Sequence, residues 1–344
     1  KMFNSLNLTD NVFFISISDD IFNRLISIKN DYNLTNKIFK SNLNLLDTNI
    51  WNKINILENN VYIYDGFMKK TEVYSSQICD NVINILRKKY NRKINFIRTS
   101  DFKSFISQQE LFKIYQKCFI GVRLTYHDGN ANTVQEFEAC KLPIIHNQSD
   151  YGIKWNNEYD IVQTIENEYK KNLVTIIVPT YNRFELLKET VFSILNQTYK
   201  IFEILIINDC SKDNDFKTYT KLEGLDDRIK VYNLENNLGA AGLVRNYGIE
   251  KSNGSYIAFC DDDDLWMENK LEKQINILNK TNYDMCSTNY YTIKNNIKIN
   301  KKVLPDFNKY PTNITLDFLS GVYPKGNIIG TSTVLLKKNI LKAK

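Results

Sequence analysis

The sequence predicts an α/β protein with two Rossmann-like domains, and three observations lead to that prediction. Short apolar runs alternate with longer amphipathic stretches in both halves of the chain, which is typical of strands and helices in a doubly wound parallel sheet. The 344 residues are enough for two separate hydrophobic cores. A hydrophobic content of 43% indicates a globular chain and excludes an intrinsically disordered one.

Charge and cysteine content narrow the class of protein further. The net charge of +6 is small for this length and no basic block is present, so we expect no dedicated nucleic-acid binder. The six cysteines show no CxxC spacing and several lie in apolar runs, which favours buried thiols in a reducing, cytoplasmic compartment. Because the chain has only two histidines, His127 and His146, a multi-histidine metal site is excluded. No apolar stretch approaches the ~20 residues of a transmembrane helix, and peripheral association with a membrane stays open.

The first half of the chain alternates strand and helix patterns. Residues 11–30 contain an apolar run, a Ser/Asp cap and an amphipathic stretch, which predict a strand followed by a helix. Residues 31–60 are polar with scattered apolar positions, and we expect connecting structure there. Further strands are expected at residues 61–64, 93–97, 118–124 and 142–146, and helices at 74–90, 109–117, 134–140 and 160–170. This order predicts a parallel sheet.

Residues 126–143 contain a possible phosphate site. A loop rich in Gly and Asn opens the expected helix there, so free backbone N–H groups point towards whatever lies in front of them. The segment resembles the nucleotide-sugar-binding lobe of GT-B glycosyltransferases of the family 4 type. The residues that match this pattern are Asp128, Gly129, Glu136, Ala139, Cys140 and Pro143. Two residues depart from it, because Asp128 stands in place of Glu and Lys141 replaces the usual Gly.

This resemblance covers roughly residues 60–170, while residues 11–30 look like the end of the other GT-B lobe. It implies that Asp128 and Glu136 contact a nucleotide sugar; the alternative for Glu136 is an ordinary exposed helix charge. His127 is expected to be a turn residue. Because GT-B enzymes react in the cleft between two lobes, we do not expect this half to be catalytic alone. The polar Lys-Lys-Asn at residues 170–172 predicts a joint between domains at 1–170 and 172–344.

The second half repeats the alternation, with a polar motif at the end of each strand. Strands are expected at residues 173–178, 202–207, 228–232 and 256–260, and helices at 185–197, 212–222 and 240–251. The polar motifs occupy residues 179–183, 208–211, 236–239 and 261–264. Since ligands of open α/β sheets bind at the carboxyl ends of the strands, the four motifs predict one shared site.

The last of these motifs consists of four consecutive carboxylates, Asp261, Asp262, Asp263 and Asp264. Four like charges at a strand end repel one another and persist most easily where a cation or solvent offsets them. Oxygen-rich clusters suit hard divalent ions such as Mg²⁺ or Mn²⁺. The alternative is a solvated turn with a helix N-cap, since Asp favours both.

The other motifs carry chemistry that suits a nucleotide. Tyr181 offers a ring that can stack near a base, and Asp209 can accept the N–H of a pyrimidine edge. Arg245 and Asn246, on the third helix of this half, are expected to face the same crevice and to meet phosphate or carboxylate. Together with the carboxylates, these residues predict a crevice for a nucleotide diphosphate.

The order of these motifs resembles glycosyltransferase family 2, which has the GT-A fold. The matching residues are Val178, Pro179, Thr180, Tyr181, Asn182, Arg183, Asn208, Asp209, Ser211, Asn237, Gly239, Arg245, Asn246, Gly248, the four aspartates and Trp266. The resemblance implies a nucleotide-diphosphate sugar donor, usually UDP-linked, a divalent cation and inverting transfer to an acceptor hydroxyl. It further implies that Asp209 reads the base, that Asp261 and Asp262 lie at the ribose and sugar, and that Asp263, with Asp261, ligates Mn²⁺ or Mg²⁺.

Some residues depart from the family pattern or stay unassigned. Cys210 stands where the family often has Gly. The family's general base is a carboxylate that follows the strand resembled by residues 326–336, so we expect it beyond Lys344. Asp306 and Asp317 are expected in turn and helix-start roles instead. Trp266 is expected to pack at a helix start, with acceptor contact as the alternative.

Two other functions were weighed against glycosyl transfer. The chain could bind a nucleotide sugar without turnover, because the base and the acceptor region are missing from it. A nucleotidyltransferase would need a Gly-rich, Lys- or Arg-bearing loop after the first strand to hold a triphosphate, and residues 179–183 lack one. The residues do not indicate whether the acceptor is a glycan, a lipid-linked molecule or a protein.

Overall fold

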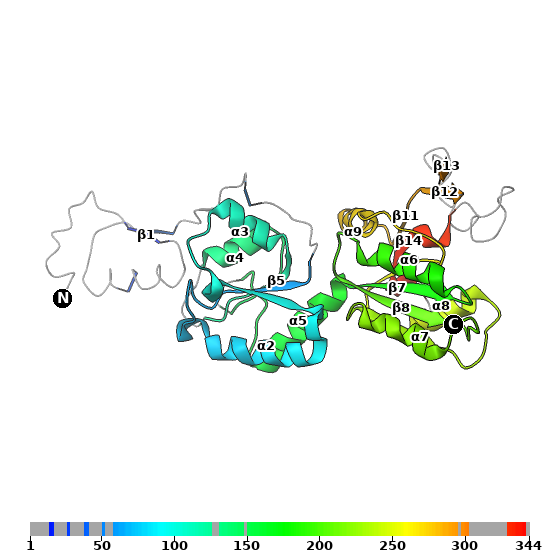
Figure 1. Ribbon diagram of the computed structural model, residues 1–344. Coiled ribbons are helices and arrows are strands. Elements are labelled where there is room, and N and C mark those ends of the chain that lie inside the picture. Colours follow the sequence, from blue (N-terminus) through cyan, green and yellow to red (C-terminus); the bar gives the residue numbers. More distant parts are fainter. Residues whose placement is uncertain are drawn as a thin grey trace. The chain divides into compact units, whose positions relative to one another are not determined.

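The computed structural model describes residues 14–16, 26–27, 38–40, 50–51, 58–125, 131–147, 150–294, 297–302 and 329–341. The chain divides into two compact units, drawn in Figure 1, and each is described by itself. The first unit comprises residues 1–54, 60–89 and 94–165, and the second comprises residues 55–59, 90–93 and 166–344. The division falls within helix α5 (Glu158–Asn172), shortly before the predicted joint.

The first unit is built on a parallel sheet with the strand order β4-β3-β5-β6. Its strands are β3 (Asn60–Ile63), β4 (Asn95–Arg98), β5 (Cys118–Val122) and β6 (Ile144–Ile145). Besides α5, its helices are α2 (Ser76–Tyr90), α3 (Gln108–Tyr115) and α4 (Asn132–Ala139). Helices α3 and α4 cover one face of the sheet and α2 covers the other (Figure 1). The predicted alternation and the parallel sheet are confirmed.

Helix α4 packs closely on this sheet through the ring of Phe137, which lies against Gly121 of β5. A Cβ atom on Gly121 of β5 would lie 2.6 Å from the Phe137 ring, so only glycine lets the helix approach the strand this closely. Lys141, just after the helix, has a φ of 58°, in the left-handed region that glycine favours. Glycine would adopt this backbone conformation with less strain than Lys141 does.

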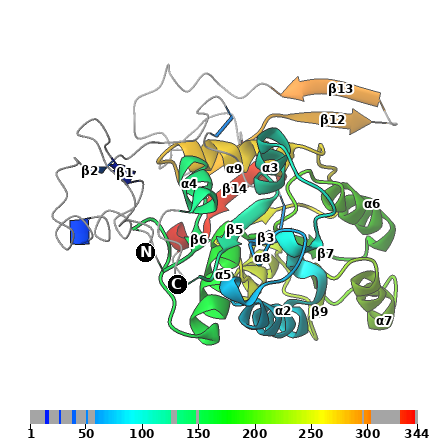
Figure 2. The same cartoon turned by 90° about the vertical axis from the view of Figure 1, so that its left-hand side faces the viewer.

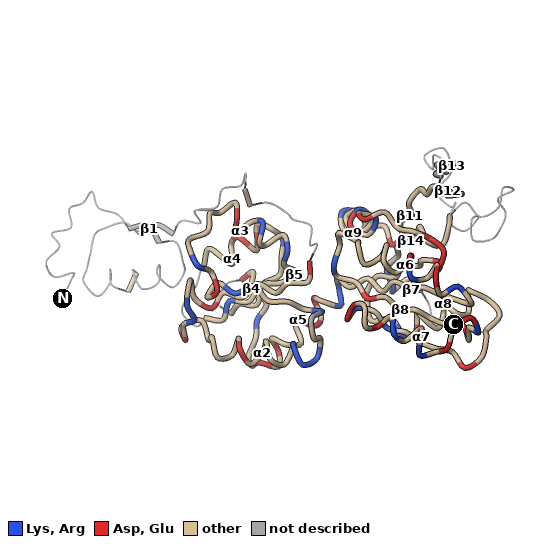
Figure 3. Tube along the Cα trace, viewed as in Figure 1, with Lys and Arg blue, Asp and Glu red and all other residues tan. Residues whose placement is uncertain are grey.

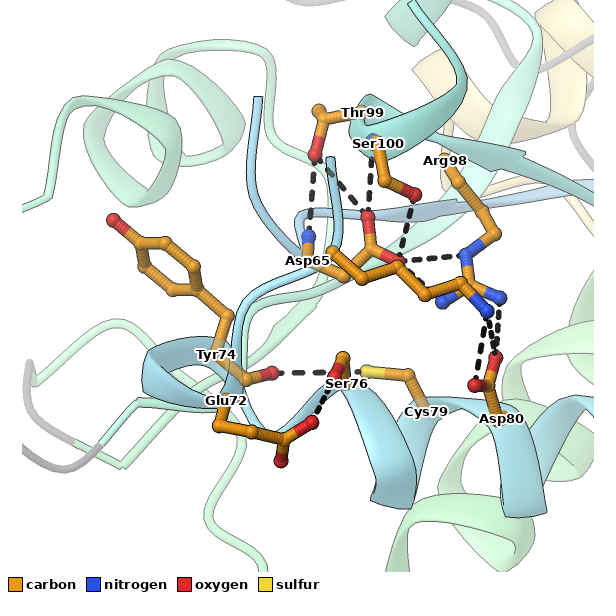
Figure 4. Close-up of polar contacts among 10 residues, drawn as sticks. Asp65, Glu72, Tyr74, Ser76, Cys79, Asp80, Arg98, Thr99 and Ser100 are labelled. Carbon is orange, nitrogen blue, oxygen red and sulfur yellow. Dashed lines mark hydrogen bonds and ion pairs between the residues drawn. The ribbon is translucent and has the colours of Figure 1, made fainter. Parts of the chain in front are cut away.

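A network of ion pairs fixes the turn that follows β3 (Figure 4). The fully buried Asp65 carboxylate accepts from Arg98 Nε at 2.7 Å and from the Ser100 hydroxyl at 3.0 Å. Arg98 also donates to Asp80 of α2 at 2.5 Å, and Lys70 donates to the same carboxylate at 2.9 Å. Although burial alone would raise it, the pKa of Asp80 is lowered by these two cations. The network therefore ties β3, β4 and α2 together.

Shorter elements complete the first unit. Strand β1 (Phe14–Ser16) pairs in parallel with β2 (Ile38–Lys40), which lies in a stretch where connecting structure was expected. Of the helix predicted within residues 11–30, only residues 26–27 are described, and both are helical. The 3₁₀ turns η2 (Glu72–Tyr74) and η4 (Thr99–Asp101) also belong to this unit, whereas η3 (Asn91–Lys93) falls within the second.

The second unit contains a six-stranded sheet with the order β11-β14-β10-β7-β8-β9. Four strands are parallel: β7 (Val174–Thr180), β8 (Phe202–Asn208), β9 (Ile229–Asn233) and β10 (Tyr256–Phe259). Strand β14 (Val334–Lys337) is antiparallel to β10, and β11 (Met285–Ser287) is antiparallel to β14.

The helices of the second unit are α6 (Phe184–Leu195), α7 (Phe216–Thr220), α8 (Ala241–Lys251) and α9 (Lys270–Lys280). The remaining elements are the 3₁₀ turns η5 (Lys221–Gly224), η7 (Thr331–Thr333) and η8 (Lys338–Ile340) and the hairpin strands β12 (Tyr290–Lys294) and β13 (Ile297–Lys302), seen in Figure 2.

The packing of the central strands brings their carboxyl ends to one edge of the sheet. Strands β7 and β8 are buried along their whole length, as expected for central strands of a parallel sheet. A Cβ atom on Gly248 of α8 would lie 2.5 Å from Ile177 Cγ2, so the helix lies directly against β7 there. Because β10, β7 and β8 are parallel neighbours, their carboxyl ends meet at one edge of the sheet.

The remaining expectations concern the distribution of charge, the state of the cysteines and membrane-spanning helices. Lys and Arg positions alternate with Asp and Glu positions along the described part of the chain trace (Figure 3). All six cysteines are free thiols. Among the residues that the structure describes, no helix has both the length and the apolar character needed to cross a bilayer.

Candidate functional site

A cleft of about 500 Å³ opens at the carboxyl edge of the sheet in the second unit. The ends of β7, β8 and β10 and the start of α8 surround it. Its lining residues are Pro179, Thr180, Tyr181, Arg183, Asp209, Asn237, Gly239, Ala240, Ala241, Val244, Arg245, Asp261, Asp262 and Asp263. Of the site residues predicted for the second half, the structure thus brings all but Asn246 and Asp264 into one cavity.

The ends of β7 and β10 are joined by a buried hydrogen bond. Thr180 Oγ1 donates to Asp262 Oδ2 at 2.8 Å, and both side chains are buried. Burial raises the pKa of Asp262, while the bonds from Thr180 and Arg183 oppose that effect. Asp262 is therefore held in one orientation at the floor of the cleft.

Arg183 pairs with the carboxylates of both Asp262 and Asp263. Its Nη1 atom lies 2.7 Å from Asp263 Oδ2 and 3.3 Å from Asp262 Oδ1. The Asp263 side chain is 46% exposed, so water and ligands can reach it. This exposure distinguishes Asp263 from the buried Asp262 and leaves oxygen lone pairs available to a ligand.

Arg245 approaches the cleft from α8. Its guanidinium pairs with the Asp261 carboxylate. The Arg245 Nε atom is buried and has no hydrogen-bond partner among the described residues. A buried donor without an acceptor is unfavourable, so an anionic ligand beside it would gain a hydrogen bond. Asn246, which was expected beside it, is exposed and does not line the cleft, because successive helix residues point about 100° apart.

Asp209 is fixed on three sides at the end of β8. Its backbone N–H donates to Thr180 O at 2.9 Å, and its Oδ1 accepts from Leu238 N at 2.8 Å. The Asn237 amide donates to the Asp209 carbonyl at 3.0 Å. These bonds hold the buried carboxylate at the wall of the cleft, while the exposed Tyr181 ring lines the same cavity.

Two residues beside the cleft adopt the left-handed backbone conformation. Asn182 has a φ of 55° and Cys210 has a φ of 61°. This conformation costs a residue with a Cβ roughly 1–2 kcal/mol, and Asn tolerates it best. The Asn182 side chain accepts from Lys212 N at 2.6 Å, and its backbone N–H donates to Ser211 Oγ at 2.9 Å. Cys210 lies where family 2 often has Gly, and its backbone explains that preference.

The carboxylates match the chemistry of a divalent cation. The acidic turn (residues 261–264) carries four carboxylates, and two arginines, Arg183 and Arg245, pair with it, which leaves an excess of two negative charges. Carboxylate oxygens are the ligands that Mg²⁺ and Mn²⁺ prefer. Burial raises the pKa of Asp264, against a hydrogen bond from Ser332. No group of three or more His, Cys, Asp or Glu side chains in the described ranges already converges as a metal site.

Sequence reasoning missed Ser332, which contacts the acidic turn. Its hydroxyl accepts from the Asp261 backbone N–H at 2.9 Å. Its position depends on the antiparallel pairing of β14 with β10, and the sequence pattern alone does not predict that pairing. Trp266 is buried and donates from Nε1 to Ser332 O at 3.0 Å, as a packing residue would.

The residues singled out in the first unit are placed differently. Glu136 is 7% exposed and accepts from the Tyr115 hydroxyl at 2.7 Å, so its interpretation as an exposed helix charge is wrong. Burial raises its pKa, although the bond from Tyr115 acts against this. Its contact with a ribose stays a prediction. Asp128, His127, Asp306 and Asp317 lie outside the described residues.

The residues that line the cleft lie in a region that is similar to known proteins. Residues 175–338 match the family model described as glycosyl transferase family 2. The chain is 34% identical over 168 residues to TuaG of Bacillus subtilis (strain 168), which is named a glycosyltransferase; the match covers 49% of this chain and 63% of TuaG. It is 39% identical over 153 residues to the UDP-Glc:alpha-D-GlcNAc-diphosphoundecaprenol beta-1,3-glucosyltransferase WfgD of Escherichia coli, covering 44% of this chain and 59% of WfgD.

A third relative matches across both units. The uncharacterized glycosyltransferase RC0461 of Rickettsia conorii (strain ATCC VR-613 / Malish 7) is 28% identical over 306 residues, which cover 89% of this chain and 41% of that protein. The chain thus spans less than two thirds of the length of each of these three relatives.

Proposed function

We propose that the second unit, whose residues 175–338 match the glycosyl transferase family 2 model, transfers a sugar from a nucleotide-diphosphate donor to a hydroxyl acceptor. One observation carries the proposal. Side chains from three parallel strand ends and one helix start converge on a single cleft that holds both acidic and basic groups. Because WfgD is named as using UDP-Glc, we take UDP as the nucleotide of the donor.

In this proposal, different residues of the cleft contact the base, the diphosphate, and the ribose and sugar of the donor. Asp209, oriented by the Leu238 N–H, accepts the N–H of the uracil edge, and the exposed Tyr181 ring stacks beside the base. The buried Arg245 Nε atom, which lacks a protein acceptor, donates to a diphosphate oxygen. Asp261 and Asp262 lie at the ribose and sugar side, with Pro179, Thr180 and Arg183 shaping the wall.

Mn²⁺ or Mg²⁺ would be held by Asp263, with Asp261. When bound, it would offset the negative charge of the leaving diphosphate. The exposed Asp263 carboxylate and the charge excess of the acidic turn support this assignment. Thr180 and Arg183 keep Asp262 oriented, so the donor meets a prearranged wall of the cleft. The acceptor hydroxyl attacks the anomeric carbon from the face opposite the diphosphate, the bond from that carbon to the diphosphate oxygen breaks, and the centre inverts. UDP leaves with the bonding electrons, and the hydroxyl proton passes to the general base expected beyond residue 344.

Release of UDP from a UDP-sugar tests transfer or hydrolysis directly. Because the general base is expected beyond residue 344, we expect the 344-residue chain to release UDP from UDP-glucose only slowly, by hydrolysis, in the presence of Mn²⁺, and Asp209→Ala to abolish that release. Binding of UDP-glucose without any release would instead favour a nucleotide-sugar-binding protein without turnover. Absence of both binding and release, tested with several UDP-sugars, would contradict the proposed function.

The first unit is proposed to be a GT-B-type nucleotide-binding lobe, with Asp128 and Glu136 beside the ligand. The parallel sheet of this unit supports the proposal. Asp209→Ala should silence the second unit. In that background, residual nucleotide binding that Glu136→Gln lowers would support the lobe, and absence of residual binding would contradict it.

A further inference from the structure

Ser332 contacts the start of the acidic turn and the residue two positions after its end. Its hydroxyl accepts from the Asp261 backbone N–H at 2.9 Å. Its carbonyl accepts from the indole of Trp266, two residues after the turn, at 3.0 Å. One residue thus holds the beginning and the flank of the segment that carries the four carboxylates.

The strand pairing explains why Ser332 lies there. Strand β14 is antiparallel to β10, with Ala258 opposite Leu335. This is the last pair of the ladder, and beyond it β10 leads into the acidic turn while η7 (Thr331–Thr333) leads into β14. The antiparallel pairing therefore places the turn that carries Ser332 beside the acidic turn.

A closed ring of buried contacts holds Ser332 in place. The Trp266 indole bonds to Ser332 O, and the next carbonyl, that of Thr333, accepts from Gln274 Nε2 at 2.9 Å. Gln274 Oε1 accepts from Lys270 Nζ at 2.7 Å, and this ammonium lies 3.8 Å from the centre of the Trp266 ring. Trp266, Gln274, Lys270 and Thr333 are all buried, so the ring is shielded from water.

We propose that Ser332 is a positioning residue for the donor cleft, which holds the acidic turn in the geometry that receives the cation and the diphosphate. This inference rests on the proposed function of that cleft. In this proposal Ser332 contacts neither the cation nor the diphosphate, and it acts through the backbone of Asp261. Outer partners of this kind typically change metal affinity 10–100-fold when they are removed.

The test compares three variants in two measurements. Ser332→Ala removes the hydroxyl and Ser332→Thr keeps it. Ser252→Ala, at the other end of the sheet, removes a hydroxyl that, among the described residues, donates to the Ile249 carbonyl alone. The first measurement is hydrogen exchange of the Asp261 amide, which needs no metal. The second is Mn²⁺ affinity in the presence of UDP, followed by the electron paramagnetic resonance signal of free Mn²⁺.

We expect Ser332→Ala to speed exchange of the Asp261 amide and to weaken Mn²⁺ binding about tenfold or more. Ser332→Thr should restore both, and Ser252→Ala should change neither. Unchanged exchange and unchanged Mn²⁺ affinity in Ser332→Ala would overturn the inference. A loss that Ser332→Thr does not restore would overturn it too, because it would indicate general destabilisation. Failure of the wild-type chain to bind Mn²⁺ with UDP would count against the proposed function itself, while Asp261 exchange would still report on the turn.

Discussion

The Thr180 hydroxyl donates to the Asp262 carboxylate at 2.8 Å and so joins the carboxyl ends of two neighbouring parallel strands, β7 and β10. The two residues are far apart in sequence and belong to different motifs. Their contact shows how the sheet gathers these motifs into one cleft. It also suggests a direct test of whether the floor of the cleft serves ligand binding.

Replacing Thr180 with Val should weaken UDP binding. The change keeps the side-chain shape but leaves the buried Asp262 carboxylate without its hydroxyl partner, which costs about 1–3 kcal/mol of stability. Thr175→Val is the matched control, because Thr175 lies in the same strand and donates to the buried Glu203 at 2.6 Å, away from the cleft. Both variants should lose stability in urea, but only Thr180→Val should lose UDP affinity. Equal UDP affinity in the two variants would contradict a role for this floor in binding.

Lys270 should make the stability of the second unit depend on pH. Burial lowers its pKa to about 7, against 10.5 for the free side chain, while Cys260 and Cys286 face it. Between these two values the unfolded chain binds a proton that the folded chain lacks, so the free energy of unfolding rises with pH from about 7 to 10.5. Lys270→Met should flatten this rise relative to wild type in urea unfolding at several pH values. The exposed Lys273→Met on the same helix should leave it unchanged; equal slopes in all three proteins would refute the prediction.

Arg98→Met should destabilise the first unit strongly. The substitution leaves the fully buried Asp65 carboxylate without its cation, and breaking a buried pair in this way costs about 3–5 kcal/mol. Lys70→Met removes a half-exposed partner of Asp80, for which about 0–1 kcal/mol is typical. Hydrogen exchange of the β3 amides measures both effects locally. Similar exchange rates in the two variants would show that the buried network does not hold the turn.

Two glycines of α8 should respond in opposite directions to alanine. Gly248→Ala places a Cβ 2.5 Å from Ile177 Cγ2 in the core and should lower the midpoint of unfolding. At Gly242 nothing lies within 4 Å of the added atom, so Gly242→Ala should stabilise the helix by up to about 1 kcal/mol. Thermal unfolding of both variants measures the difference. A stabilised Gly248→Ala would mean that the helix lies farther from β7 than described.

The residues that sequence reasoning placed well are those at strand ends. Tyr181, Asp209 and Asp263 each follow an apolar run, and in a parallel sheet such ends share one edge, so their grouping follows from local pattern alone. Asn246 was misplaced because the rotation of a helix residue depends on where the helix begins and which face packs.

Other features depended on tertiary pairing or backbone conformation. Ser332 reaches Asp261 only through an antiparallel register that no short-range pattern encodes. Glu136 is buried because Tyr115 of another helix meets it, which residue spacing does not reveal. Lys141 and Cys210 stood out as departures from family patterns, and both adopt the left-handed conformation that glycine favours.

Calorimetric titration of UDP, with and without Mn²⁺, tests the central claim most directly. We expect wild-type protein to bind UDP more tightly with Mn²⁺, and Asp263→Asn to lose that enhancement because its exposed carboxylate is the proposed ligand. Asp284→Asn, an exposed aspartate that pairs with Lys337 and does not line the cleft, should behave as wild type. UDP binding that gains nothing from Mn²⁺ in the wild type, or an enhancement that survives in Asp263→Asn, would contradict the metal assignment. Absence of UDP binding altogether would contradict the nucleotide-sugar site.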